Sequence, residues 1–245
     1  MLEGLERLEY RGYDSAGIAV LNDNNLTVCK TTERIKNLTE KTNGGKDIHG
    51  TTGIGHTRWA THGAPSDKNA HPHTSSNGKF AVVHNGIIEN YVALREELKA
   101  DGAEFKSETD TEVIPQLLAR CYTGDFFEAV AKTVKRLEGS YALGIICTDY
   151  PDTLIAVRKF SPLILGLSDD ANYIASDVTA IVSHTKDIMY IEDGEIAVLT
   201  PCGVKLYDGD KNELHRDHAV ISWDVSAAEK GGYPHFMLKE IHEEP

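Results

Sequence analysis

The second half of the chain is a run of short apolar segments joined by very short polar connections, and this run limits the folds that the chain can adopt. Parallel strands need crossover connections of a dozen or more residues, whereas antiparallel strands can be joined by a few. Residues 192–195, Glu-Asp-Gly-Glu, are typical of a hairpin turn. The pattern therefore predicts antiparallel sheets, with strands at residues 142–147, 153–157, 163–167, 173–175, 189–191 and 196–199.

The first half adds strands and helices by the same tests of periodicity. Apolar residues three or four positions apart predict helices, and short apolar runs between turn residues predict strands. Because the helices gather in the middle of the chain with strands on both sides, we expect antiparallel sheets packed together and covered by helices. The predicted helices start at Leu2 and cover residues 90–100, 111–121 and 126–137, and the predicted strands cover 17–21, 26–29, 51–59 and 80–84.

Composition excludes several classes of protein. With 40% hydrophobic residues among 245, the chain can bury a core. The chain has 38 acidic and 25 basic residues, and the resulting net charge of −13 argues against binding to nucleic acid. No apolar run approaches the roughly 20 residues of a membrane helix, and no signal-peptide pattern is present. We therefore expect a cytoplasmic protein without a membrane partner.

One glycine-punctuated segment carries side chains suited to ligand binding. It reads Gly53-Ile54-Gly55-His56-Thr57-Arg58-Trp59-Ala60-Thr61-His62-Gly63 and runs from a predicted strand into a loop. An arginine provides a planar fork for a carboxylate, and Trp59 is placed to close over a small ligand. The alternative is the end of a buried strand at which Arg58 forms an ordinary salt bridge.

Two further segments allow both a functional and a local structural interpretation. Asn85-Gly86 follows the predicted strand, so an amide side chain and a backbone N–H emerge together, as an oxyanion hole requires. Asn-Gly is also a common tight-turn dipeptide. Asp110 and Glu112 lie at the start of a predicted helix, where a carboxylate can cap the helix or hold the ammonium group of a ligand.

Histidines are concentrated in one part of the chain, since six of the eleven fall from His49 to His84. His71-Pro72-His73 invites a metal-site interpretation, but its spacing matches no zinc motif, and loop hydrogen bonding or ligand contact is favoured. Four cysteines without a CxxC pair provide neither a zinc site nor a disulfide framework. There is no GxGxxG or P-loop sequence, so we expect no metal and no cofactor.

Five segments occur in the order seen in class II glutamine amidotransferases, which the chain resembles over nearly its whole length. The resemblance implies an α+β fold, a four-layer αββα sandwich of two antiparallel sheets known as the N-terminal-nucleophile hydrolase fold. It also implies hydrolysis of the side-chain amide of L-glutamine to glutamate and ammonia. The segments are Arg11-Gly12-Tyr13-Asp14-Ser15-Ala16-Gly17, residues 56–63, Asn69-Ala70-His71-Pro72-His73, His84-Asn85-Gly86-Ile87-Ile88-Glu89-Asn90 and residues 107–112.

The resemblance also implies roles for individual residues. Arg58 is expected to hold the α-carboxylate of glutamine and Asp110 its α-ammonium group. Asn85 and Gly86 are expected to form the oxyanion hole. The other substrate-site residues that the resemblance implies are Trp59, Thr61 and His62 in a loop that closes over the substrate, with Arg11 and His71 beside it.

In one respect the sequence departs from this family. The family's nucleophile is a cysteine at the mature N-terminus, whose own α-amino group serves as the general base, whereas this chain opens Met1-Leu2. An internal cysteine has no free α-amine and cannot substitute. We therefore expect a sandwich truncated at its first strand, and a chain that is inactive by itself. The internal cysteines are Cys29, Cys121, Cys147 and Cys202.

The motifs resemble family members that use fructose 6-phosphate more than those that use phosphoribosylpyrophosphate. This implies a glutaminase domain over residues 1–208 and a connector over residues 209–245. The connector would lead to sugar isomerase domains that carry the fructose 6-phosphate site, in an enzyme that forms a homodimer at full length. Another acceptor, or an inactive glutamine-binding fragment, stays open as an alternative.

Overall fold

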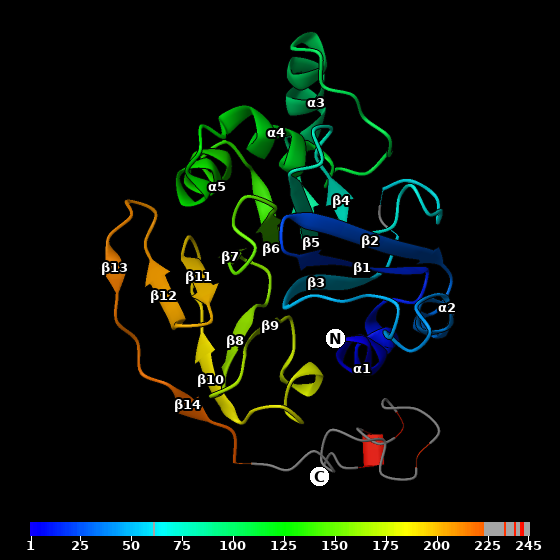
Figure 1. The fold of residues 1–245 in the computed structure, drawn as a ribbon, viewed down its shortest axis with the longest axis vertical. Coiled ribbons are helices and arrows are strands. Elements are labelled where there is room, and N and C mark those ends of the chain that lie inside the picture. Colours follow the sequence, from blue (N-terminus) through cyan, green and yellow to red (C-terminus); the bar gives the residue numbers. More distant parts are fainter. Residues whose placement is uncertain (61, 223–232, 234–237, 239–240, 243–245) are drawn as a thin grey trace.

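A seven-stranded antiparallel sheet lies at the centre of the structure (Figure 1). The structure is a computed structural model that describes residues 1–60, 62–222, 233, 238 and 241–242. Each strand pairs antiparallel with its neighbours, as the short connections predict. In spatial order the strands are β13 (Glu213–Leu214), β12 (Gly203–Tyr207), β11 (Ile196–Thr200), β7 (Leu154–Lys159), β6 (Gly139–Cys147), β5 (Phe80–Ile88) and β4 (His73–Thr74).

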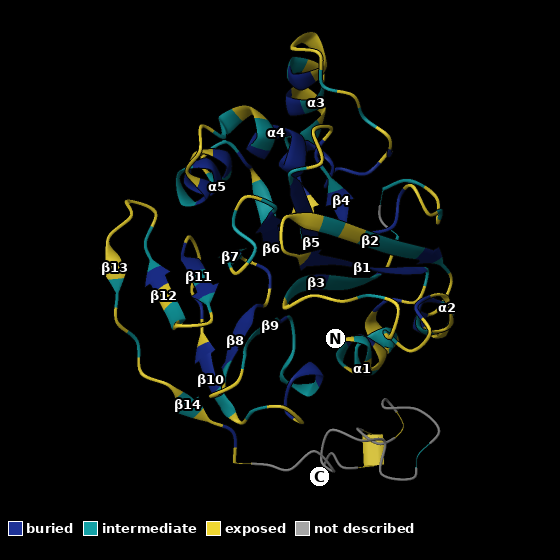
Figure 2. Ribbon diagram, in the orientation of Figure 1, coloured by how far each residue is buried: buried dark blue, intermediate teal, exposed yellow. Residues whose placement is uncertain are grey.

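Three helices cover one face of this sheet and bury their inner sides against it (Figure 2). Leu94 and Leu98 lie one turn apart on the same side of their helix, and both are buried. They belong to a core cluster that also contains Leu143 and Ile145 of β6. The predicted helices in this region are confirmed with slightly different ends, as α3 (Tyr91–Ala100), α4 (Val113–Cys121) and α5 (Phe126–Val134).

The other face of the central sheet packs against two smaller antiparallel sheets. Small residues of the central sheet, such as Ala81 and Ala156, face them and allow a close approach. One smaller sheet has the order β2-β1-β3 and the other β14-β10-β8-β9. Their strands are β1 (Ser15–Asn22), β2 (Asn25–Thr32), β3 (Thr52–Arg58), β8 (Ile164–Leu167), β9 (Asn172–Ala175), β10 (Asp187–Tyr190) and β14 (Ala219–Val220).

Short helices close the outer side of the two smaller sheets. Leu5 and Leu38 pack on β1, and Ala180 and Ile181 pack on the β8–β10 side. The layers therefore run helix, sheet, sheet, helix, which confirms the predicted αββα sandwich. In the described residues, one sheet layer consists of two separate sheets instead of one. The outer helices are α1 (Leu2–Arg7), η1 (Glu9–Arg11), α2 (Ile35–Lys41) and η2 (Val178–Ala180).

One prediction for the second half of the chain needs correction. Residues 192–195 do not close a hairpin, because β10 and β11 belong to different sheets, so the turn carries the chain from one layer to the other. The polar stretch after residue 208 also contributes strands, since β13 pairs with β12 and β14 pairs with β10. The domain boundary at residue 208 stays a prediction, with paired strands on both sides of it.

The Asn85-Gly86 pair lies inside a strand, so the tight-turn interpretation is wrong. β5 continues to Ile88, with Asn85 opposite Ala142 and Gly86 opposite Tyr141. Gly86 has a φ angle of +136°, and a Cβ atom there would lie 2.1 Å from the carbonyl oxygen of Ser140. A glycine is therefore required at this point both by the backbone conformation and by the adjacent strand.

We predict that Gly86→Ala destabilises the protein by more than about 3 kcal/mol, because backbone strain and a backbone clash add. The matched control is Gly78→Ala, which also has a positive φ, +72°, but open space around the position. That variant should lose only about 1 kcal/mol. Urea unfolding of the two variants beside the parent measures both values, and equal losses would contradict the clash at Gly86.

Candidate functional site

A cavity of about 920 Å³ lies between the sheet layers, and β3 and β9 both line it along their whole length. Within the described part of the chain, each of these strands is the edge of its own sheet and is paired on one side alone. The central sheet contributes Val83 to Ile87 of β5 and Ala142 to Gly144 of β6 to the cavity wall. The candidate site lies at the end of this cavity where β3 reaches Arg58.

Arg58 ends β3 with a buried guanidinium group that is only partly satisfied. Arg58 as a whole residue is 4% exposed. Nη2 donates to the backbone carbonyls of His62 and Gly63, the latter at 3.2 Å, whereas Nη1 is buried and has no hydrogen-bond partner among the described residues. Burial lowers the pKa of Arg58, and Asp14 and Asp110 act in the opposite direction. A buried donor of this kind fits a bound anion.

Asp110 brings a buried carboxylate to the same cavity. Its Oδ2 accepts a hydrogen bond from the backbone N–H of Ile88 at 2.8 Å. Its oxygens also lie 3.8 Å from Nδ1 of His62 and 4.0 Å from Nδ1 of His84. Helix α4 begins only at Val113, with no side-chain cap, so the helix-capping interpretation of Asp110 is wrong. The carboxylate is tied to β5 instead.

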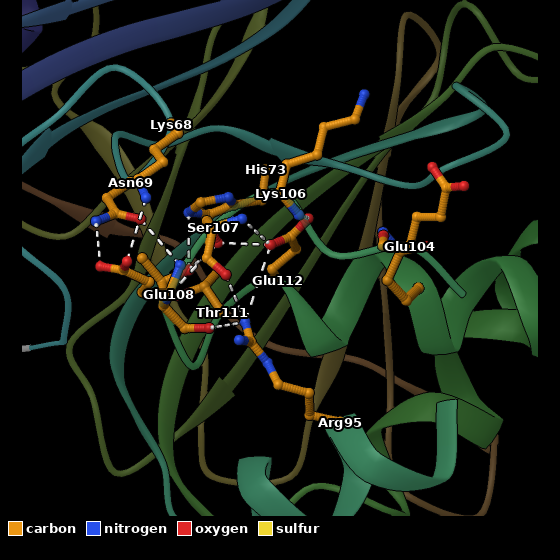
Figure 3. Close-up of polar contacts among 12 residues, drawn as sticks. Lys68, Asn69, His73, Arg95, Glu104, Lys106, Ser107, Glu108, Thr111 and Glu112 are labelled. Atoms are coloured by element: carbon orange, nitrogen blue, oxygen red, sulfur yellow. Dashed lines mark hydrogen bonds and ion pairs between the residues drawn. The ribbon is translucent and has the colours of Figure 1, made fainter. Parts of the chain in front are cut away.

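A polar network holds the loop that carries Asp110 (Figure 3). The carboxylate of Glu112 accepts from the backbone N–H groups of Lys106 and Ser107, at 2.8 and 2.6 Å, and from the Ser107 hydroxyl at 2.6 Å. Arg95 donates from α3 to the carbonyls of Ser107 and Thr109. Glu112 therefore folds the loop instead of capping the helix. Arg95 also lies 3.9 Å from the Glu112 carboxylate, and no sequence motif marked it because its hydrogen-bond acceptors are backbone carbonyls.

The other predicted site residues differ in whether they line the cavity and in what they contact. Arg11, Asn85, Gly86 and His71 line the cavity, and Arg11 also pairs with Asp177 at 3.1 Å. Trp59 lines the rim, but it is 59% exposed and contacts the ring of Tyr13. The ring of His62 packs on Tyr91. Thr61 lies outside the described residues.

Four buried histidines form a cluster whose rings meet at different angles, and three of them, His56, His71 and His84, line the same cavity as Arg58 and Asp110. The ring centroids of His56 and His71 lie 4.4 Å apart, those of His71 and His73 4.9 Å, and those of His71 and His84 6.5 Å. Burial lowers the pKa of all four, that of His56 to about 3, so the rings are neutral at pH 7. Among the described residues, no group of three or more potential ligands has a geometry suited to a metal ion.

Comparison with known proteins identifies the family of this chain. Residues 56–183, more than half of the 245-residue chain, match the glutamine amidotransferase domain family. The chain belongs to this family. The match includes Arg58, Asn85, Gly86 and Asp110, and the predicted resemblance is confirmed.

Relatives of this amidotransferase domain are similar over all 245 residues. The glutamine–fructose-6-phosphate aminotransferase [isomerizing] of Clostridium acetobutylicum is 57% identical, and that of Aquifex aeolicus is 55% identical. The chain spans about 40% of the length of these relatives. Among solved structures, glutamine phosphoribosylpyrophosphate amidotransferase from B. subtilis matches with a TM-score of 0.75 and 27% identity, over 86% of this chain and 46% of that one.

The cysteines of this amidotransferase domain lie away from the site. None of the residues that line the cavity is a cysteine. Burial raises the pKa of Cys147 to about 11, which opposes formation of a thiolate, and Cys202 is exposed in a turn between β11 and β12. A cysteine nucleophile for this site is therefore not found among the internal cysteines.

The histidine cluster predicts that folding stability falls with mild acidification. An unfolded histidine has a pKa near 6.5, above the folded values, so the unfolded chain binds more protons below that pH. The stabilising effect is complete above about pH 6.5 and is lost as the pH falls toward the lowered folded pKa values, of which that of His56 is about 3. The loss is up to about 1.4 kcal/mol per pH unit for each histidine.

Urea unfolding at pH 7.5 and 5.5 tests this, because most carboxylates titrate at lower pH. His73→Asn should make the stability less dependent on pH, whereas His49→Asn, at an exposed position, should leave the dependence unchanged. Equal stability of the parent chain at the two pH values would contradict neutral, buried rings.

Proposed function

We propose that this domain binds L-glutamine at the Arg58 end of the cavity and is the glutaminase part of a longer enzyme that releases glutamate and ammonia. The observation that carries this proposal is the pairing of opposite charges in one cavity. Arg58 has a buried, unsatisfied donor, and Asp110 has a buried carboxylate. A free amino acid carries a carboxylate and an ammonium group at fixed separation, so two such residues define its pose.

The side-chain amide of glutamine would then extend toward β5. Asn85 and Gly86 line the cavity on that strand, and they supply an amide side chain and a backbone N–H. Neutral donors aimed at a carbonyl oxygen stabilise the negative charge that develops when a nucleophile attacks it. Because Gly86 is held by pairing with Tyr141, its backbone is oriented before the substrate arrives.

We assign the nucleophile to a strand that this chain does not contain. The edges of β3 and β9 face the same cavity, and unpaired edges are binding sites for an added strand. β3 has seven residues, a length of about 23 Å. A strand beginning with Cys-Gly would join the two smaller sheets into one. Its α-amino group, with a pKa of about 7.7 to 8.0 when unperturbed, suits a general base at neutral pH.

For the whole enzyme we propose transfer of the ammonia to fructose 6-phosphate, giving glucosamine 6-phosphate. The support is identity of 55–57% over all 245 residues to aminotransferases of that name, against 27% to the phosphoribosylpyrophosphate enzyme. The connector over residues 209–245, the sugar isomerase domains, a homodimer and a cytoplasmic location belong to the same proposal. No helix among the described residues is both long and apolar enough to cross a bilayer.

The proposed function predicts that a synthetic strand restores activity. A peptide of about eight residues, with cysteine first, glycine second and apolar β-forming residues after them, should bind the 245-residue chain and produce glutamate from L-glutamine. The same peptide with serine first, or with its N-terminus acetylated, should bind without activity. Coupled glutamate dehydrogenase assays and calorimetry measure the two properties. Glutamate release by the chain without peptide, or binding of the cysteine peptide without activity, would contradict the assignment.

Arg58→Lys should weaken the affinity for L-glutamine by about tenfold or more. The lysine keeps the charge but loses the planar fork whose Nη2 holds the His62 and Gly63 carbonyls while Nη1 stays open to a carboxylate. Calorimetric titration with L-glutamine measures the effect, and no turnover is expected in the absence of the nucleophile. Arg34→Lys, at a side chain that is 71% exposed, is the matched control and should bind as the parent does. An unchanged affinity in Arg58→Lys would remove Arg58 from the site.

A further inference from the structure

The His71-Pro72-His73 segment lies opposite Thr109-Asp110-Thr111 in an antiparallel arrangement. Nε2 of His71 is 3.3 Å from the Thr111 hydroxyl, and Nε2 of His73 is 3.1 Å from the Thr109 hydroxyl. All four side chains belong to buried residues. The two histidines therefore contact the two threonines that flank Asp110, one on each side.

The hydrogen bonds around Thr111 allow a single assignment of donors and acceptors. The carbonyl of Ser140 can only accept, so Nε2 of His84, 3.4 Å away, carries the proton. In a neutral ring Nδ1 of His84 then accepts from the Thr111 hydroxyl at 2.9 Å. The Thr111 oxygen is left to accept from Nε2 of His71, whose Nδ1 accepts from the backbone N–H of His84 at 3.4 Å. Each of these groups is satisfied in a single arrangement.

The hydrogen bonds around Thr109 also allow a single assignment of donors and acceptors, and they end at the Glu112 carboxylate. The Ser107 hydroxyl donates to Glu112 at 2.6 Å, because the carboxylate can only accept. The Thr109 hydroxyl then donates to the Ser107 oxygen at 3.0 Å and accepts from Nε2 of His73. Figure 3 shows His73 close to Ser107 and Glu112, the two ends of the loop of residues 107–112.

We propose that His71 and His73 are positioning residues for the Asp110 carboxylate, acting through the Thr111 and Thr109 hydroxyls in two hydrogen-bond chains of fixed direction. The chain through Thr111 ends at Ser140, beside Gly86, so it also connects the Asp110 loop to the strand with the oxyanion donors. This gives the histidine motif a role in positioning Asp110. The inference rests on the proposed function, because it assigns Asp110 to the substrate ammonium group.

Thr111→Val and Thr109→Val test the proposal, because valine keeps the shape and removes the hydroxyl. Each should weaken L-glutamine binding by about tenfold. Binding of glutaramate, which lacks the α-ammonium group, should change by less than about twofold. Thr111→Ser, which keeps the hydroxyl, should restore L-glutamine affinity. Thr133→Val is the matched control, since Thr133 is fully buried and its hydroxyl has no hydrogen-bond partner among the described residues.

Competition titrations monitored by NMR give both dissociation constants. An equal loss for L-glutamine and glutaramate would overturn the proposal, because a general structural effect does not select for the ammonium group. Unchanged L-glutamine binding in both valine variants would overturn it as well. Failure of the parent chain to bind L-glutamine would instead overturn the proposed function.

Imidazole ¹⁵N spectra of the 245-residue protein at pH 7, without any ligand, test the two hydrogen-bond chains directly. We expect His71, His73 and His84 each to show a single neutral tautomer with the proton on Nε2. Thr111→Val should shift the His71 and His84 signals and leave those of His73 in place. Rings with the proton on Nδ1, or with averaged tautomers as in an unfolded chain, would overturn the proposal whatever the binding results show.

Discussion

The hydrogen bond from the backbone N–H of Ile88 to the Asp110 carboxylate is the contact on which the site depends. It is buried and 2.8 Å long, and it joins the loop of residues 107–112 to β5, the strand that contains Asn85 and Gly86. A carboxylate at this depth is stable only because it accepts such donors. The same bond therefore satisfies a buried charge and sets the separation between the group proposed to bind the ammonium and the donors proposed to bind the oxyanion.

The surroundings of this bond are polar to a degree that is unusual between packed sheets. Arg58 keeps an unsatisfied donor there, and four neutral histidines form a cluster in the same region. Each of these groups costs stability compared with an apolar side chain of similar volume. Departures of this kind from the usual rules of core composition are concentrated at functional sites. The alternative interpretation of Arg58 as a salt-bridged strand end does not account for the open donor.

Local patterns predicted most strands and helices, but not how they pair. The apolar runs 142–147 and 196–199 were predictable because alternation and flanking turns are local properties, and both became strands of the central sheet. The turn at 192–195 was misinterpreted because its two strands join different layers. Asn85-Gly86 resembled a turn because the pairing with β6 that keeps it extended involves residues more than 50 positions away. For the same reason the threonine partners of His71 and His73 could not be foreseen from the sequence.

The layered construction also explains how recognition and chemistry can be carried by different parts of an enzyme. Arg58 comes from β3, Asp110 from a loop held by α3 and Glu112, and Asn85 and Gly86 from β5 of the central sheet. These positions are fixed by pairing and packing within the 245 residues, so the groups proposed to bind glutamine do not need the proposed nucleophile for their placement. The nucleophile, in contrast, is proposed to enter with a strand between β3 and β9, along the same cavity. A strand paired antiparallel with β3 in that position would have its first residue opposite Arg58, at the end of the cavity where the charges lie.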